Sequence, residues 1–322
     1  MWIAIGLIAL GIGLLVFGGE MLLRGSVSLA TLLKLTPAVI GLTVVAVGTS
    51  IPELAVSAIA TAHGEVDIAI ANVVGSNIFN IGVIVGLSAI IAPLTISGNT
   101  IKLEYPVLAI VSLLCLVVCQ DGYINWLDAV LFIVIYAGFT AYLVGLVREQ
   151  VTAQERQEFQ AEVAELQPQE SKPQIGWSLG LVGFGAICLA LGAHSTVHGA
   201  VEIARLLGWS ERLIGLTIVS AGTGLPELVA SVISALKGRS DVALGNVIGS
   251  NLFNILGSLG ICGLVTPLPI APQLFEFDCV CMLAITVTLF PLMYTGLQIT
   301  RREGAVLLAL YGGYLGYLIF SA

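Results

Sequence analysis

The sequence predicts an all-α polytopic membrane protein with ten transmembrane helices, arranged as two inverted five-helix repeats. Of its 322 residues 57% are hydrophobic and only 10% are charged, and the mean hydropathy is +1.03. These values exclude an ordinary soluble domain. The apolar runs have the length of about 20 residues that a spanning helix needs, and the alternating segments of a membrane β-barrel are absent. An internal repeat predicts the two-part architecture, and the placement of the basic residues predicts the orientation in the membrane.

Ten apolar runs of spanning length lie along the chain, five on each side of one long polar segment. Their approximate ranges are residues 2–23, 38–62, 67–91, 102–120, 125–147, 175–197, 212–236, 241–265, 277–295 and 303–320. We expect the first run to be a retained helix, because no basic residue precedes it as in a signal peptide. The chain therefore divides into a first repeat (1–147), a polar linker (148–174) and a second repeat (175–322).

The positions of the basic residues predict the orientation. With the N-terminus outside, ten of the twelve fall on the inner side, and only Arg205 and Arg212 fall outside. The inner ten are Arg24, Lys34, Lys102, Arg148, Arg156, Lys172, Lys237, Arg239, Arg301 and Arg302. Because Lys and Arg mark the cytoplasmic side, we expect both termini to be non-cytoplasmic and the linker to be cytoplasmic. The expected location is a prokaryotic plasma (inner) membrane.

Residues 41–80 recur at 215–254 without a gap, and 21 of the 40 positions are identical. Such self-similarity indicates a duplicated structural unit. Because each half has an odd number of spans, the second half must enter the membrane upside down relative to the first. Inverted repeats with interrupted helices are typical of secondary transporters, whose substrate site lies near the bilayer midplane.

The first repeated block combines a helix breaker with an acid. Pro52 and Pro226 each remove an amide donor and clash with the carbonyl four residues back, which predicts a kink or a short unwound turn. The next residues, Glu53 and Glu227, lie in mid-span, where an acid costs about 2.5–3.5 kcal/mol. No Lys or Arg lies in the middle of any predicted span, so the partner is a proton or a metal cation. Two protonated acids that merely join helices are the structural alternative.

The second repeated block supplies four oxygen-bearing side chains, one helical turn apart within each pair: Ser76 and Asn80, and Ser250 and Asn254. Each pair shares one helix face. The neighbouring Asn77 and Asn251 point elsewhere, and we interpret them mainly as helix-to-helix hydrogen-bonding groups. Carboxylate, hydroxyl, amide and carbonyl oxygens together favour a hard cation such as Ca²⁺, Na⁺ or Mn²⁺. Two ionised glutamates would neutralise one divalent cation or two monovalent ones.

The first and sixth spans are rich in glycine. These glycines are Gly6, Gly11, Gly13, Gly18 and Gly19 in one span, and Gly176, Gly180, Gly183, Gly185 and Gly192 in the other. Small residues let helix backbones approach closely. Tight static packing and a smooth sliding face are both open interpretations.

The paired blocks resemble the alpha repeats of the cation/calcium exchanger superfamily, and Gly48–Glu53 is similar to the motif of its prokaryotic sodium/calcium exchanger branch. The resemblance implies that Glu53 and Glu227 are the central Ca²⁺ ligands, with the carbonyls of Thr49 and Thr223. It further implies Na⁺ and central ligands at Ser50, Ser76, Ser250, Asn80, Asn254 and the carbonyls near Ala46 and Ser220. It also implies that the first and sixth spans slide over a core of eight helices.

Two residues depart from the pattern of that family. Gly224 stands where the motif usually has Ser, so one Na⁺ site loses a hydroxyl ligand. Asn254 stands where potassium-dependent members carry an acid, which argues against coupling to K⁺.

The sequence thus predicts an antiporter that exchanges cytoplasmic Ca²⁺ for Na⁺ by alternating access. The alternative is an antiporter of Ca²⁺, or another divalent cation, and H⁺ that uses the same glutamates. An intramembrane acid–base enzyme would need a lateral substrate entrance, which neither the duplication nor the repeated ligands would serve, so we expect no enzyme. We expect no permanently bound cofactor, no nucleic-acid partner in the absence of a basic patch, and a monomer that acts on Ca²⁺ and Na⁺ within the lipid bilayer.

Overall fold

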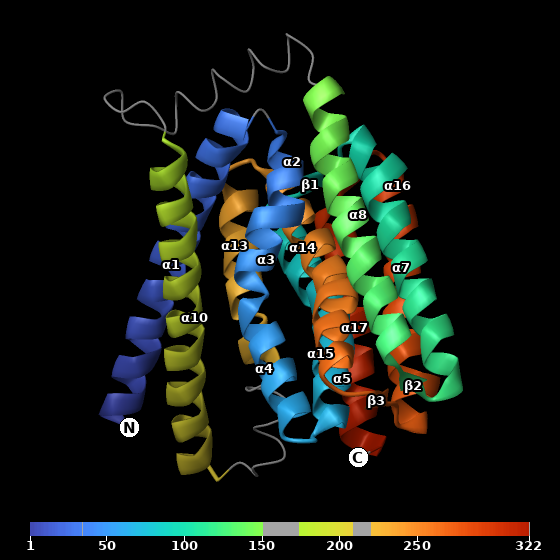
Figure 1. Ribbon diagram of the computed structural model, residues 1–322. Helices are drawn as coiled ribbons and strands as arrows, with labels where there is room; N and C mark the ends of the chain where they lie inside the picture. The colour runs from blue at the N-terminus through green and yellow to red at the C-terminus, as the bar shows by residue number, and fades with distance from the viewer. Residues whose placement is uncertain (34, 151–173, 209–219, 322) are drawn as a thin grey trace.

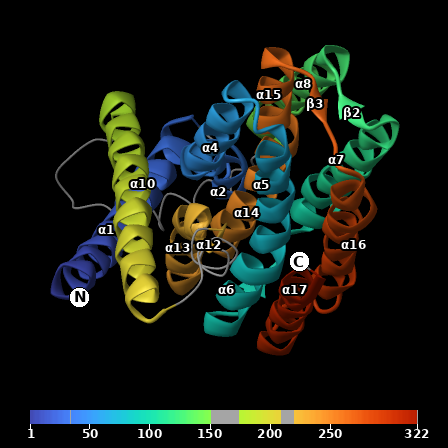
Figure 2. The same cartoon turned by 90° about the horizontal axis from the view of Figure 1, so that it is seen from below.

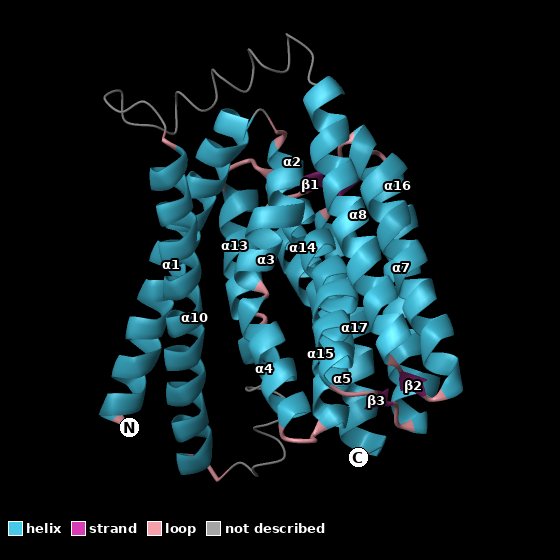
Figure 3. Cartoon of the chain, in the orientation of Figure 1, coloured by secondary structure: helices cyan, strands magenta, loops and turns pink. Residues whose placement is uncertain are grey.

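The computed structural model describes residues 1–33, 35–150, 174–208 and 220–321, and almost all of them are helical (Figures 1 and 3). Long helices stand side by side, and α1 and α10 lie next to each other at one edge of the bundle (Figure 1). The N- and C-termini lie at the same end. The regular helices agree with the all-α class that the apolar runs predict, since backbone polar groups in a membrane must be satisfied within the segment.

The first half contains these helical segments: α1 (Trp2–Leu33), α2 (Pro37–Ile40), η1 (Gly41–Val45), α3 (Ala46–Thr49), α4 (Ile51–Ala62), α5 (Val66–Phe79), η2 (Asn80–Val85), α6 (Gly86–Ile91), η3 (Thr100–Glu104), α7 (Tyr105–Val118), η4 (Cys119–Asp121) and α8 (Trp126–Gln150). The segments η1, η2 and η3 are π-helical. They join their neighbours into longer continuous rods, so that α5, η2 and α6 form one span.

The second half repeats this order with α10 (Ile175–Leu206), α12 (Ser220–Thr223), α13 (Leu225–Leu236), α14 (Ser240–Leu252), η6 (Phe253–Ser258), α15 (Leu259–Val265), η7 (Leu274–Cys279), α16 (Val280–Tyr294) and α17 (Arg301–Ser321). The π-helical η6 lies within one residue of the repeat position of η2, and these two segments contain Asn254 and Asn80, the last polar residues of the second repeated block. A π-bulge inside an α-helix often marks a functional site.

Eight helices among the described residues are long and apolar enough to cross a membrane, and a ninth span results if the bent pair Ala38–Thr49 and Ile51–Ala62 is one span. The remaining predicted span, residues 212–236 and the seventh along the chain, falls partly outside the described residues. Its described part, α12 and α13, includes the shorter apolar helix Leu225–Leu236. The structure therefore shows a polytopic helical membrane protein, and the count of ten stays a prediction. The linker, predicted at 148–174, also lies mostly outside the described residues.

Two short strand pairs tie the halves together. The strand β1 (Leu94–Thr95) pairs antiparallel with β4 (Gln298–Ile299), and β2 (Tyr123–Ile124) pairs with β3 (Leu268–Pro269). Each pair joins a helix connection of the first half to one of the second half. The helices α5 to α8 and α14 to α17 are thereby held together at both ends of the bundle.

The two repeated segments form the centre of the bundle. Of the most apolar stretch of the span Val66–Ile91, 67% is buried inside the protein. The buried share is 89% in Ser240–Val265 but only 11% in Arg301–Phe320. Figure 2, which looks along the bundle, shows α5 and α14 between the α1–α10 pair and the helices α7, α16 and α17. The polar residues of the second repeated block therefore lie in the protein interior and not toward lipid.

Some of the glycines of α1 and α10 bring these two helices together. Three glycines of α1, seven residues apart, face the α10 backbone: Gly11, Gly18 and Gly25. A β-carbon on Gly18 would lie 2.8 Å from the carbonyl oxygen of Gly185, and one on Gly25 would lie 2.8 Å from that of Ser178. Close approach of this kind is typical of small-residue helix interfaces in membranes. Tight packing is therefore the finding for the glycines that face the other helix of the pair, and the sliding of α1 and α10 over the core stays a prediction.

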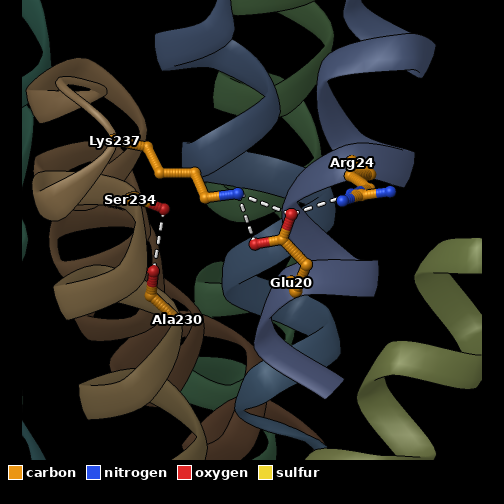
Figure 4. Close-up of polar contacts among 5 residues, drawn as sticks. All are labelled: Glu20, Arg24, Ala230, Ser234 and Lys237. Atoms are coloured by element: carbon orange, nitrogen blue, oxygen red, sulfur yellow. Dashed lines mark hydrogen bonds and ion pairs between the residues drawn. The ribbon is translucent and has the colours of Figure 1, made fainter. Parts of the chain in front are cut away.

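An ion pair links α1 to the end of α13 (Figure 4). Both carboxylate oxygens of Glu20 contact Lys237, at 2.5 Å, and Oε1 also accepts a hydrogen bond of 2.8 Å from Nε of Arg24. Lys237 is the residue at which α13 ends, where a positive charge is favoured by the helix dipole. The α1–α10 pair thus has a polar attachment to the core as well as an apolar one.

The packing of α1 against α10 predicts that Gly18→Val destabilises the protein. The new side chain has no space, because its β-carbon would lie under 3.0 Å from backbone and side-chain atoms of α10. We expect a loss of roughly 1–3 kcal/mol, the usual cost of overpacking, seen as a lower midpoint of thermal unfolding in detergent. The control is Gly13→Val on the same helix, where nothing lies within 4 Å. Equal losses in both variants would show that helix propensity, and not the interface, decides.

Candidate cation site

The two predicted helix breaks are confirmed, and each lies directly before a glutamate. Ser50, with φ −86° and ψ 5°, separates α3 from α4, and the two helix segments meet at 46°. Gly224, with φ −81° and ψ 2°, separates α12 from α13 in the same way. Proline follows in the first turn of both later helices, where its missing amide is tolerated. Glu53 and Glu227 therefore lie in the first turn of a helix, whose N-terminal dipole favours a negative charge.

Both glutamates are buried, each with an exposed fraction of 1%. Oε1 of Glu227 accepts a hydrogen bond of 2.8 Å from Oγ of Ser50, which belongs to the other half of the chain. Oε2 of each glutamate has no hydrogen-bond partner among the described residues. A buried carboxylate with a free oxygen is costly unless a cation or a proton meets it. The two helix breaks thus bring together the acids that the sequence predicts as ligands.

Two asparagines that the sequence analysis missed anchor the glutamate backbones. Nδ2 of Asn72 on α5 donates to the carbonyl of Glu53 at 3.1 Å and to Oγ of Ser57 at 3.0 Å. Nδ2 of Asn246 on α14 donates to the carbonyl of Glu227 at 3.3 Å and to Oγ of Ser231 at 2.9 Å. The signal was available, since Asn72 and Asn246 are identical at one repeat position in apolar surroundings.

A further contact joins the first helix break to the second half. Oγ1 of Thr49 donates to Oδ1 of Asn246 at 3.2 Å and lies 3.3 Å from the carbonyl oxygen of Ala46. That carbonyl also accepts the amide of Ser50 at 3.0 Å, so one lone pair is used within the helix. A carbonyl oxygen has two lone pairs, and Ala46 therefore retains some capacity for a cation. In the second half Ser220 begins α12 and Thr223 ends it; the side chain of Ser220 lies outside the described residues.

The polar residues of the second repeated block are all buried: Ser76, Asn80, Ser250 and Asn254. Nδ2 of Asn80 donates to Oδ1 of Asn251 at 2.9 Å, and Nδ2 of Asn251 lies 3.4 Å from the carbonyl oxygen of Asn77. These bonds confirm the helix-to-helix interpretation of Asn251. The side chain of Asn77 instead donates to the carbonyl of Val73 in its own helix at 2.9 Å, and its Oδ1 has no partner among the described residues. Oγ of Ser250 and both amide atoms of Asn254 also have no partner among the described residues, as expected of groups that meet an ion or water.

The donor set determines which metals this region suits. No group of three or more His, Cys, Asp or Glu side chains within the described ranges is placed to hold a metal ion. A cation here would depend on two carboxylates together with hydroxyl, amide and carbonyl oxygens. This hard-oxygen set suits Ca²⁺ and Na⁺ better than metals that prefer thiolate or imidazole ligands.

Comparison with known proteins gives matches along the whole chain. The family described as "Sodium/calcium exchanger protein" matches residues 3–145 and 177–320. CaxA of Alkalimonas amylolytica is 39% identical over 100% of both chains, and the sodium/calcium exchanger MaX1 of Methanosarcina acetivorans is 32% identical over 98% of both. A solved structure of the sodium-calcium exchanger NCX_Mj has a TM-score of 0.82 and 32% identity, covering 98% of this chain and 99% of that one. The chain therefore belongs to the sodium/calcium exchanger family.

Proposed function

We propose that this protein is a secondary antiporter that exchanges cytoplasmic Ca²⁺ for Na⁺ at a site centred on Glu53 and Glu227. The observation that carries the proposal is the pair of buried carboxylates at the two helix breaks, each with an Oε2 that has no hydrogen-bond partner in the described part of the chain. Two negative charges match one Ca²⁺ or two Na⁺. The related proteins MaX1 and NCX_Mj carry the name of sodium/calcium exchangers, which supports the same pair of ions here.

The proposed ligands follow the geometry around the glutamates. Ca²⁺ would be held by both carboxylates and by the carbonyls of Thr49 and Thr223. The residues proposed for the flanking Na⁺ positions and the centre are Ser50, Ser76, Ser250, Asn80, Asn254 and the carbonyls of Ala46 and Ser220. Support comes from Oγ of Ser250 and the side-chain amide of Asn254, which have no hydrogen-bond partner within the described ranges. The hydroxyl hydrogen of Ser50 is directed at Glu227, which leaves lone pairs of its oxygen for a cation.

Transport in this proposal proceeds by alternating access in an inverted repeat. The pair α1 and α10 moves over the remaining helices, of which α5 to α8 and α14 to α17 are joined by the strand pairs β1–β4 and β2–β3. With no cation bound, the site carries uncompensated buried charge, so the empty protein does not change readily between its two access states. Exchange of one ion for another is therefore obligatory. The distribution of basic residues supports non-cytoplasmic termini in an inner membrane.

Glu53→Gln and Glu227→Gln are the direct test of the site. Each removes one of two buried charges that a cation must balance, a loss of about 3–5 kcal/mol, which corresponds to at least about a 100-fold loss of Ca²⁺ affinity. We expect Ca²⁺ flux into vesicles to disappear, while the purified variants remain folded. The control is Asp67→Asn, an exposed acid in the first turn of α5. Near-normal flux in both glutamine variants would refute the assignment.

The alternative, exchange of Ca²⁺ or another divalent cation for H⁺, is favoured by one observation: Gly224 offers no hydroxyl where the first half has Ser50. Uptake of ⁴⁵Ca²⁺ into proteoliposomes loaded with Na⁺, K⁺ or choline, with the pH gradient collapsed, separates the two functions. We expect uptake only with internal Na⁺, because Na⁺ must replace Ca²⁺ on the carboxylates. Uptake that ignores Na⁺ and follows an imposed pH gradient would establish the proton-coupled function instead.

Removal of the Glu20–Lys237 ion pair is predicted to shift the equilibrium between the two proposed access states. It joins α1 to α13 in this arrangement and must break if α1 slides. A partly exposed pair contributes up to about 1 kcal/mol, so Lys237→Met should change the ratio of the apparent Ca²⁺ affinities on the two membrane faces by up to about fivefold. The matched control is Arg302→Met, an exposed cation at the start of α17. Equal ratios in wild type and both variants would show that the pair takes no part in the movement.

A further inference from the structure

The two helix breaks have the same backbone but different side chains. Ser50 and Gly224 occupy one repeat position, 174 residues apart. Their dihedral angles are nearly equal, at φ −86° and ψ 5° against φ −81° and ψ 2°. Both lie at negative φ, a region open to any L-residue. The backbone therefore gives no reason for glycine at position 224.

Ser50, the residue at the first helix break, forms a hydrogen bond with one of the two buried glutamates. Its Oγ crosses to the other half and donates to Oε1 of Glu227 at 2.8 Å. By the internal repeat, the equivalent hydrogen bond to Glu53 would come from a hydroxyl at position 224. Gly224 lacks it, so no hydroxyl at this position can donate to Glu53. Oε2 has no partner among the described residues in either glutamate, and the difference between the two carboxylates is the bond from Ser50 to Oε1 of Glu227.

An aromatic ring occupies the space that a side chain at position 224 would need. A β-carbon built on Gly224 would lie 2.6 Å from Cε1 and 2.8 Å from Cδ1 of Phe79, closer than real contacts allow. The ring of Phe79 is buried and packs edge-on against Tyr311, with centroids 5.7 Å apart at 78°. Tyr311 in turn lies against Gly82, whose β-carbon would come within 2.8 Å of Cβ of Tyr311. The ring is therefore held in place by a packed neighbour.

The repeat counterpart of this ring lies elsewhere. Phe253 packs against Gly257, whose β-carbon would lie 2.7 Å from Cδ2 of the ring, and against Tyr136 at 5.6 Å. Ser50 thus keeps its hydroxyl bond to Glu227, while Gly224 meets a hydrocarbon ring. The two carboxylates have unequal surroundings: one faces a hydroxyl from the opposite half, and the other does not.

We propose that Phe79 and Gly224 form a specificity-determining pair that removes one monovalent-cation position beside Glu53. A cation that has left water needs oxygen ligands on several sides. The ring replaces a hydroxyl with C–H groups and fills the space that a water ligand would use. This inference rests on the proposed Na⁺/Ca²⁺ exchange and specifies it: Ca²⁺ binds through both carboxylates, but fewer Na⁺ ions accompany the return step than a symmetrical site would hold.

The test restores the symmetrical site. The double variant Phe79→Ala/Gly224→Ser makes room and supplies the hydroxyl, and the matched control Phe79→Ala/Gly224→Ala makes the same room without it. In proteoliposomes we expect the serine variant to carry one more Na⁺ per Ca²⁺ than wild type, seen as one more charge per cycle in the reversal potential. The alanine variant should keep the wild-type ratio. The same ratio in wild type and in the serine variant would overturn the proposal.

Equilibrium binding separates this inference from the proposed function. Displacement of ⁴⁵Ca²⁺ from the purified variants by Na⁺ is measured together with Ca²⁺ binding alone, which verifies that each variant folds. If Na⁺ does not displace Ca²⁺ from the wild type, the proposed exchange fails. A gain of Na⁺ displacement in the serine variant alone would then still support the role of Phe79 and Gly224. Absence of that gain, or an equal gain in the alanine variant, would refute it.

Discussion

The burial of two carboxylates is the constraint on which the rest of this structure depends. Glu53 and Glu227 are 1% exposed, and an acid at such a depth is tolerated only where the protein supplies partners or a cation arrives. The helix breaks at Ser50 and Gly224 place each acid at a helix N-terminus. The bond from Ser50 to Glu227 crosses between the halves. Asparagines fix the glutamate carbonyls, so the carboxylates are positioned by rigid helices and not by a loop.

The same structure is built in two parts that pack by different means. Within the α1–α10 pair, the glycines bring backbone against backbone, as where Gly18 faces the carbonyl oxygen of Gly185. Between the pair and the core, glycines receive the tips of side chains: Gly19 of α1 meets Ile233, and Gly222 of the core meets Val197 of α10. Backbone contacts fix a register, whereas side-chain tips can repack at low cost. This difference favours movement of α1 and α10 as one unit.

The sequence was sufficient for those features that depend on one segment at a time. Apolar length predicted the membrane helices, and the repeated proline–glutamate pairs predicted both breaks and both buried acids. Contacts between different helices could not be predicted, because nothing along the chain states how two helices are placed side by side. Asn72 and Asn246 were therefore missed despite their identity across the repeat, and the contact of Phe79 with Gly224 is apparent only once α5 lies beside the second break.

The differences between the halves have an energetic consequence for an inverted repeat. If the halves were identical, the inward-open and outward-open states would be related by exchanging their roles and would have equal energy. The ion pair of Glu20 and Lys237 has as its repeat counterparts His194 and His63, each 174 residues away. Neither of two histidines carries a negative charge, so they do not form an ion pair with each other. In the alternating access that we propose, the state shown here therefore has a stabilising contact that its counterpart would lack, and this one ion pair would favour one of the two access states.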